Sequence, residues 1–165
     1  CSSDLEIADG WLPIFYSPRI SGMYNEWLDE GFARAGARRT RETFEICATA
    51  QIIVTDDRPM VMEMMKPHLA LYMGGMGSED TNFHAEVYRR MGYSEVVDDV
   101  TKLFRSDRKD EAAKVIPDEL VDDSAIVGDL DYVKEQIKAW EASGVTMMVV
   151  GAKSVEQIKQ LAELV

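Results

Sequence analysis

The chain has 165 residues, 46% of them hydrophobic and 29% charged, which is typical of one globular domain with a substantial core. Its formal net charge of -12 at pH 7 would repel a nucleic-acid backbone or an anionic membrane, so the sequence predicts neither as a partner. No apolar run reaches the roughly 18 residues that a membrane-spanning helix needs, and we expect a cytoplasmic location.

The first third of the chain predicts two strands with a helix between them. Residues 3–8 are typical of the end of a helix, and the apolar run at residues 10–15 ("GWLPIF") predicts a buried strand that Pro13 weakens. Residues 23–35 place apolar side chains on one helical face. Residues 44–54 ("FEICATAQIIV") alternate in the way that a strand requires, and this is the clearest strand pattern in the sequence.

A long helical stretch follows. Asp57 and Pro59 are typical of a helix start, because aspartate caps free N–H groups and proline is tolerated in the first turn. The predicted helix covers residues 59–73, and we expect Pro67 to bend or split it, because proline removes one backbone hydrogen bond. Further amphipathic helices are predicted at residues 82–91, 94–106 and 110–116.

The last third returns to helix and strand. A helix is predicted at residues 130–142, a continuous apolar strand at residues 145–150 ("VTMMVV") and a final helix at residues 155–164. This alternation favours an α/β fold with a parallel sheet covered by helices. Three strands bury little surface and leave two open edges, so the pattern indicates part of a larger barrel. We expect a single unit over residues 1–165 with a helical insertion at about residues 58–128.

Cysteine and histidine usage gives no sign of a disulfide framework or a metal centre. The two cysteines are Cys1 and Cys47, and neither has a thiol or histidine beside it in the sequence. His68 and His84 are 16 residues apart, a spacing that matches no common zinc motif. The sequence therefore predicts no metal site.

Four separate segments resemble one family. They are "EIADGWLPIFYSP", "YMGGMGSEDTNF", "RKDEAAKVIPDELVDD" and "AWEASGVTMMVVGA", at residues 6–18, 72–83, 108–123 and 139–152. Together they resemble the C-terminal half of luciferase-like oxidoreductases and monooxygenases, and the branch that uses the deazaflavin coenzyme F420 is the nearest. The resemblance extends over nearly the whole chain, in order and with plausible spacing.

This resemblance implies a (β/α)8 barrel of which the chain supplies the C-terminal part. In such enzymes a flavin or deazaflavin lies at the barrel mouth and exchanges a hydride with a small organic substrate. F420 is the expected cofactor, with FMN as the alternative. A complete barrel needs about 250 residues, so we expect the chain to begin partway through the fold and to be incomplete without the N-terminal half. The expected protein partner is that missing half or a second copy of the chain.

Two other functions stay open at this point. A half barrel could be a non-catalytic interaction module that dimerises through its open strand edges. The chain could also be a small helical binding protein whose strands are short and peripheral. The substrate itself is not readable, because one fold supports many reactions.

Two groups of residues are candidates for a cofactor or substrate pocket. Trp11, Phe15 and Tyr16 lie in or just after the first predicted strand, close to the barrel mouth that the resemblance implies. The second group lies at a break in the helical region and consists of Gly74, Gly75, Met76, Gly77 and Asn82.

The glycine break has two interpretations. Glycine permits positive φ and close approach of a ligand, and methionine gives deformable apolar contact, so the segment could form a lid or pocket wall. Alternatively, Gly74 ends one helix, a polar side chain caps the next, and the methionines fill the core. No catalytic residue is assigned from the sequence.

Overall fold

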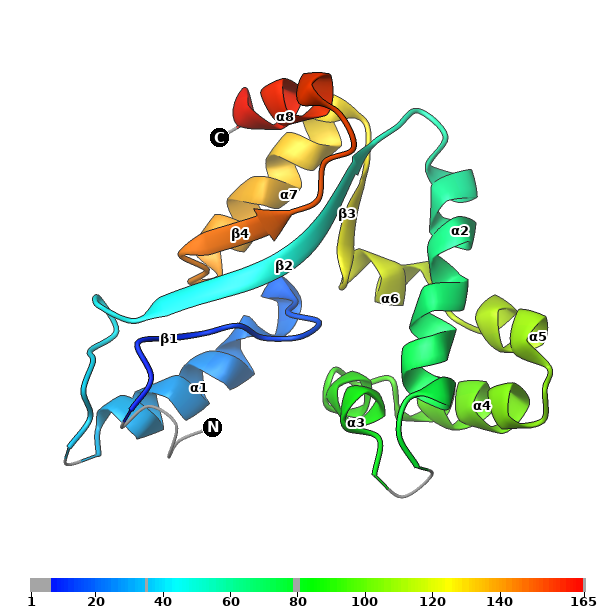
Figure 1. Cartoon of the computed structure of the whole chain (residues 1–165), viewed down its shortest axis with the longest axis horizontal. Coiled ribbons are helices and arrows are strands. Elements are labelled where there is room, and N and C mark those ends of the chain that lie inside the picture. The colour runs from blue at the N-terminus through cyan, green and yellow to red at the C-terminus, as the bar shows by residue number, and fades with distance from the viewer. Residues whose placement is uncertain (1–6, 35, 79–80, 165) are drawn as a thin grey trace.

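The computed structural model describes residues 7–34, 36–78 and 81–164 (Figure 1). In this part of the chain four strands form one sheet: β1 (Gly10–Trp11), β2 (Glu45–Val54), β3 (Ala125–Gly128) and β4 (Met147–Val150). Every pairing is parallel, and the long strand β2 makes all of them. The start of β2 pairs with β1, its middle with β4 and its end with β3. The predicted α/β fold class with parallel strands is confirmed.

The predicted strands are present, but the prediction missed one. Strand β1 ends at Trp11 and does not reach residue 15, because Pro13 has no N–H to donate to a sheet. Strand β3 was overlooked because it is a run of only four residues beside an acidic segment, and periodicity cannot identify so short a run. Its residues, which were predicted to belong to the helical insertion, are all buried in the sheet.

Helices cover one face of the sheet. They are α1 (Ser21–Phe32), α7 (Leu130–Ala142) and α8 (Val155–Ala162), and a short 3-10 turn, η2 (Pro18–Ile20), leads into α1. Alternate residues of β2 point into this core, since successive side chains on a strand face opposite ways. The core beneath the helices contains these strand residues and large side chains of the helices, among them Ile46, Ala48, Ala50, Ile52, Leu28, Ile137 and Trp140.

The other residues of β2 define an open face of the sheet. Thr49 and Gln51 are exposed and Cys47 is half-buried, although all three are in the central strand. In the parallel register Cys47 is opposite Met147 and Thr49 is opposite Val149. Met147 is 55% exposed and Val149 is 45% exposed. A central strand with one bare face is the arrangement expected where further strands of a barrel are absent.

The helical region between β2 and β3 forms a body of its own, on the right in Figure 1. It contains α2 (Arg58–Ala70), a π-helical turn η3 (Leu71–Gly75), α3 (Phe83–Arg90), α4 (Ser94–Arg105), α5 (Lys109–Lys114) and α6 (Asp118–Asp122). Its apolar core includes Met62, Met73, Tyr88, Val97, Val100 and Leu120, each no more than 1% exposed. The predicted helices are confirmed with small differences at their ends, and α6 was not predicted.

Helix α2 begins and ends as its sequence indicates. The Asp57 side chain accepts a hydrogen bond from the Met60 N–H, so the predicted cap is present. Pro67 lies inside α2, and the regular helix changes to the π-helical turn at Leu71, four residues later. Such turns are rare and interrupt the helical pattern, which agrees with the expected effect of Pro67. The predicted helical end at residues 3–8 lies mostly outside the described residues.

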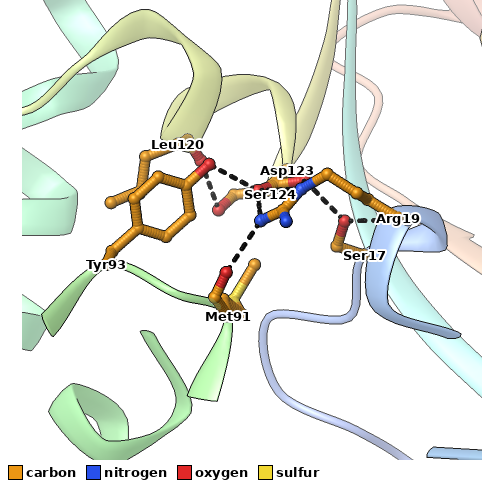
Figure 2. A network of polar contacts seen from close by, with 7 residues as sticks. All are labelled: Ser17, Arg19, Met91, Tyr93, Leu120, Asp123 and Ser124. Atoms are coloured by element: carbon orange, nitrogen blue, oxygen red, sulfur yellow. Dashed lines mark hydrogen bonds and ion pairs between the residues drawn. The ribbon is translucent and has the colours of Figure 1, made fainter. Parts of the chain in front are cut away.

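A buried carboxylate joins the helical region to the segment that follows β1 (Figure 2). The Ser17 hydroxyl donates to Asp123 Oδ1 over 2.7 Å, and Arg19 Nε donates to both carboxylate oxygens over 3.0 Å. The Tyr93 hydroxyl donates to Asp123 Oδ2 over 2.7 Å, while Arg19 Nη2 also donates to the Met91 carbonyl over 3.0 Å. Three segments that are far apart in the sequence are therefore held at one point.

Candidate functional site

A cavity of about 710 Å³ opens between the segment after β1, the open face of β2 and helix α2. This volume lies within the range of about 300–1,000 Å³ that is usual for small-molecule sites. The described residues that line the cavity are Leu12, Pro13, Ile14, Phe15, Thr49, Gln51, Met64, Met65, His68, Leu69, Tyr72 and Ser124.

The cavity has one polar wall and two mainly apolar walls. Thr49 and Gln51 are two residues apart on β2, so their side chains project from the same face of the strand. Ser124, just before β3, adds a hydroxyl whose Oγ donates to the Leu120 carbonyl over 3.1 Å. The α2 wall is apolar except for the His68 ring, and the segment after β1 presents only apolar side chains. This is the composition typical of a pocket for a mainly apolar molecule with a few polar groups.

Phe15 is held in an unusual conformation at the edge of this cavity. Its φ is +54°, a left-handed value that costs a residue with a Cβ on the order of 1–3 kcal/mol. Three aromatic neighbours hold the ring: the centroid distances are 4.8 Å to Tyr88, 5.1 Å to Tyr72 and 6.0 Å to His84. Packing thus fixes Phe15 where it forms part of the cavity wall.

Two polar atoms behind this wall have no hydrogen-bond partner among the described residues. They are Nδ1 of His84 and the hydroxyl of Tyr88, both fully shielded from solvent. Burial raises the pKa of Tyr88 well above its ordinary value, so the phenol stays neutral. The ring centroids of His84 and Tyr72 are 4.8 Å apart, and those of Tyr72 and His68 are also 4.8 Å apart. His68 lines the cavity.

Trp11 and Tyr16 lie away from the cavity, in the core beneath the helices. Tyr16 is 1% exposed and stacks on Tyr24, with ring centroids 5.3 Å apart. Its hydroxyl donates to the Ser143 carbonyl over 3.0 Å, and burial raises its pKa despite this bond. Trp11 packs edge-on against Tyr24 at 5.2 Å. Of the three aromatic candidates, the structure places only Phe15 on the cavity wall in the described part of the chain.

The glycines at the helix break make room for another helix. A Cβ at Gly74 would lie 2.5 Å from Phe104 Cβ, and a Cβ at Gly75 would lie 2.7 Å from Phe104 Cε1. Both positions thus permit α4 to pack closely on the π-helical turn. Gly77 has a φ of +78°, so it serves the turn that follows.

Asn82 and Met76 are the remaining two candidate residues at the helix break. The Asn82 side chain accepts hydrogen bonds from the N–H groups of His84 and Ala85 and donates to the carbonyls of Tyr72 and Met73. It therefore caps α3 and ties it to the π-helical turn. Met76 is 38% exposed. These contacts are those of the capping and packing interpretation, and none of the five residues at the break lines the cavity in the described ranges.

Sequence reasoning missed most of the cavity. Thr49, Gln51, His68 and Tyr72 were not among the candidates. A usable signal was present for the first two, because both are polar residues at alternate positions of the clearest strand. On a strand buried on both faces such positions would be apolar.

Comparison with known proteins decides the family. Residues 4–147 match the family model described as luciferase-like monooxygenase. The chain belongs to this family. A protein of Mycobacterium tuberculosis with the provisional name coenzyme F420-dependent oxidoreductase is 73% identical over 160 residues, which is 97% of this chain and 46% of that protein. The predicted resemblance to the F420-dependent branch is confirmed.

More distant relatives agree with this placement. The 5,10-methylenetetrahydromethanopterin reductase of Archaeoglobus fulgidus is 30% identical over 152 residues, covering 89% of this chain and 43% of the reductase. The chain thus spans less than half the length of the curated relatives it matches.

Solved structures show the same fold. The coenzyme F420-dependent tetrahydromethanopterin reductase of Methanopyrus kandleri superposes with a TM-score of 0.69 at 22% identity, over 99% of this chain and 45% of the enzyme. An F420-dependent secondary alcohol dehydrogenase, solved with an F420-acetone adduct, gives a TM-score of 0.61 at 11% identity, over 99% of this chain and 44% of the dehydrogenase. The prediction of part of a (β/α)8 barrel is confirmed by these matches.

The described helices give no candidate for a membrane span, since none of them combines the required length with sufficient hydropathy.

Proposed function

We propose that this chain is the C-terminal part of an F420-dependent oxidoreductase, in which it forms one side of the pocket where a small organic substrate exchanges a hydride with the cofactor. The observation that carries the proposal is the cavity over the open face of β2, in a chain of the luciferase-like family. The names of the relatives, which refer to F420-dependent oxidoreductases, support the choice of cofactor.

The residues of the cavity fit a flat ring. Phe15, Leu69 and Met65 offer apolar surface, and Thr49 and Gln51 offer hydrogen bonds from one side only. When bound, the deazaflavin supplies the chemistry of hydride transfer, and the protein supplies orientation and electrostatics. Held against Tyr88 and Tyr72, Phe15 would keep this wall rigid and exclude water from the reacting molecules. FMN is the alternative occupant.

The open face of the sheet supports the proposal that further polypeptide covers it in the complete enzyme. Met147 and Val149 expose apolar surface in line with Cys47 and Thr49, and Leu12 and Ile14 expose more beside the cavity. In a closed barrel such side chains are buried by residues from other strands. The remaining part of a full-length relative is therefore the expected partner, in a soluble and cytoplasmic enzyme.

A non-catalytic dimerisation module is the second candidate function. The same exposed apolar residues on β4 favour it, since two copies of a four-stranded sheet could cover each other's bare faces. Light scattering decides between the two readings of this surface. A stable dimer of this chain that also excludes the remaining part of the relative would favour the module.

A chimera tests the enzyme proposal. The part of the Mycobacterium tuberculosis protein that this chain does not match is fused to this chain as one polypeptide, which the 73% identity makes feasible. Oxidised F420 and FMN are titrated separately into the chimera and into the chain alone, and binding is followed by absorbance and fluorescence. We expect the chimera to bind F420 at least tenfold more tightly than FMN, and the chain alone to bind neither tightly.

Two results would oppose the proposal. A folded chimera that binds FMN but not F420 would contradict the choice of cofactor. Tight F420 binding by the chain alone would contradict the requirement for the missing part. The variant Gln51→Leu, which removes a polar group from the cavity, should weaken F420 binding by the chimera, and Gln136→Leu on α7 is its matched control.

A further inference from the structure

We infer that the ring of Phe15 closes a second, smaller binding site beside the cavity, and that this site takes a small neutral aromatic molecule with one hydroxyl group, that is, a phenol. The site lies behind the Phe15 ring, at the buried polar atoms of His84 and Tyr88. Every residue that defines it belongs to this chain. The inference therefore goes beyond the proposed function and does not depend on it.

Two buried polar atoms on one helix are the first observation. Nδ1 of His84 and the hydroxyl of Tyr88 each lack a hydrogen-bond partner within the described ranges. Tyr88 is fully buried, and the two residues are four positions apart in α3, so they lie on the same face of this helix. Polar atoms in protein interiors are nearly always hydrogen-bonded. Two exceptions side by side indicate that a partner from outside the protein binds here.

Ser124 shows that the Tyr88 hydroxyl lies close to the cavity wall. Burial raises the pKa of Tyr88, and the nearby Ser124 hydroxyl opposes this increase only in part. Ser124 lines the cavity, and its Oγ donates to the Leu120 carbonyl over 3.1 Å. No hydrogen bond joins it to the Tyr88 hydroxyl. A ligand that enters from the cavity can therefore reach this hydroxyl once the Phe15 ring moves.

The conformation of Phe15 favours such a movement. Phe15 lines the cavity, and its ring packs on the rings of Tyr88 and His84 at centroid distances of 4.8 Å and 6.0 Å. Its φ of +54° is strained for a residue with a Cβ, and displacement of the ring can release this strain. The cavity of about 710 Å³ beside it has room for the displaced ring. In its closed position Phe15 is the rigid wall described above, and the open position is a less populated state that a ligand selects.

The surroundings of the ring define the chemistry of the ligand. A molecule that replaces the Phe15 ring meets the rings of Tyr72, Tyr88 and His84, and edge-on or tilted contacts of this kind favour another aromatic ring. It must also satisfy the two buried polar atoms. A hydroxyl group both donates and accepts hydrogen bonds, so it can serve the Tyr88 hydroxyl and either tautomer of His84. A simple phenol is uncharged at neutral pH, which suits a buried site.

The two histidines of the chain make a specific test possible. His68 lines the cavity, whereas His84 lies behind Phe15. This chain is labelled with 15N in its histidine rings, and phenol and toluene, which have nearly the same shape, are titrated separately. We expect phenol to shift the Nδ1 signal of His84 and to bind more tightly than toluene by about tenfold or more, because only phenol supplies the missing hydrogen bonds.

A first pair of variants tests the role of Phe15. Phe15→Gly removes the ring and places at φ +54° the residue that adopts this conformation without strain. It should raise the affinity for phenol by about tenfold or more, because no ring has to be displaced. Phe83→Gly removes the same side chain at a position that is 84% exposed, and it should leave the affinity unchanged.

A second pair of variants tests the polar atoms. Tyr88→Phe removes a hydroxyl that has no partner in the described structure, so the variant should fold, as circular dichroism can check. It should abolish the preference for phenol over toluene. Tyr24→Phe makes the same change at a buried tyrosine in the core beneath the helices, and it should keep the preference.

Four results would overturn the inference. They are equal binding of phenol and toluene by the wild type, shifts of the His68 signals alone, an equal effect of Tyr88→Phe and Tyr24→Phe on the preference, and no binding of phenol by Phe15→Gly. The second result would place phenol in the main cavity, and the last would leave water as the partner of the buried atoms. None of these measurements involves F420. A failure here can therefore be told apart from a failure of the proposed function, which the chimera tests with the cofactor itself.

Discussion

The helical region and the sheet region of this chain are covered to different degrees. Helices α2 to α6 surround a core whose central side chains, such as Leu120 and Val100, are inaccessible to solvent. The sheet has an equally buried core on one face, around Trp140 and Ala48, but its other face carries exposed Thr49 and Gln51. Among the described residues the helical region thus buries its own apolar surface, whereas the sheet leaves one face uncovered.

The cavity lies where these two regions meet. Its apolar wall comes from α2 of the helical region and its polar wall from the open face of β2. A helical body beside a sheet is a suitable way to build a pocket, because one wall can vary without disturbing the sheet.

The largest effect is expected in the sheet core. Trp140→Ala removes a side chain that is 1% exposed and lies 5.8 Å from the Tyr16 ring, so the free energy of unfolding should fall by about 3–5 kcal/mol. Urea denaturation followed by circular dichroism measures the change. Amide exchange should increase most in α7 and β2 and least in α4, because α4 packs in the helical core.

Val155→Ala is the control for this experiment. Val155 is 62% exposed, so its replacement should change stability by less than about 0.5 kcal/mol. If Trp140→Ala accelerated exchange in α4 as much as in α7, the two regions would unfold as one unit and the comparison would fail.

The joint between the two regions should respond to acid. Burial alone would raise the pKa of Asp123, but hydrogen bonds from Arg19, Tyr93 and Ser17 outweigh it and hold the pKa below the ordinary 3.8. A carboxylate with a lowered pKa adds stability that is complete above the unfolded-state pKa and is lost as the pH falls through the folded-state pKa. The wild type should therefore lose stability as the pH drops below about 4.

Asp123→Asn should remove this contribution at pH 7, by about 1–3 kcal/mol after allowing for the half-exposed Arg19. Urea denaturation at pH 7 and at lower pH should show the variant and the wild type converging as the solution becomes acidic. Glu135→Gln, which breaks an exposed pair with Lys138, should leave the stability difference between the two pH values almost unchanged. A constant gap between Asp123→Asn and the wild type at all pH values would contradict the assignment.

An effect of similar size is expected at the glycine break. Gly74→Ala would place a methyl group 2.5 Å from Phe104 Cβ and should destabilise the helical region by about 1–3 kcal/mol. Gly22→Ala in α1 is the matched control, because a Cβ there meets no atom within 4 Å and should stabilise the helix by about 0.5–1 kcal/mol. Thermal unfolding of both variants checks this. Equal effects of the two substitutions would show that close packing against Phe104 is not what Gly74 provides.

Much of the fold could be predicted from the sequence because local signals agreed with the tertiary structure. The alternation in β2, the Asp57 cap and the periodicity of α7 each specify an element without help from distant residues. Strand β3 was not predicted, because four consecutive buried residues show no hydrophobic periodicity. Only their pairing with β2 identifies them as a strand.

The cavity was harder to predict than the fold. Phe15 was found through its place after a strand, but the neighbouring Tyr16 turns into the opposite core, and no local pattern distinguishes the two. His68 in α2 and Tyr72 in η3 line the same cavity as β2 only because of the tertiary fold, which no local pattern reveals. Gly74 and Gly75 were candidates for a lid or pocket wall. In the structure they pack against Phe104, which is 30 residues after Gly74 and 29 after Gly75.

We expect the bare face of β2 to be the inner face of a barrel that other polypeptide completes. Cys47 lies on this face, opposite Met147. The accessibility of its thiol therefore shows whether other polypeptide covers the face. In a Cys1→Ser background, the rate of Cys47 modification by a thiol reagent is measured in the chain alone and in the folded chimera. We expect modification to be at least tenfold slower in the chimera. Equal rates would contradict the claim, because they would mean that this face stays open when the rest of the barrel is present.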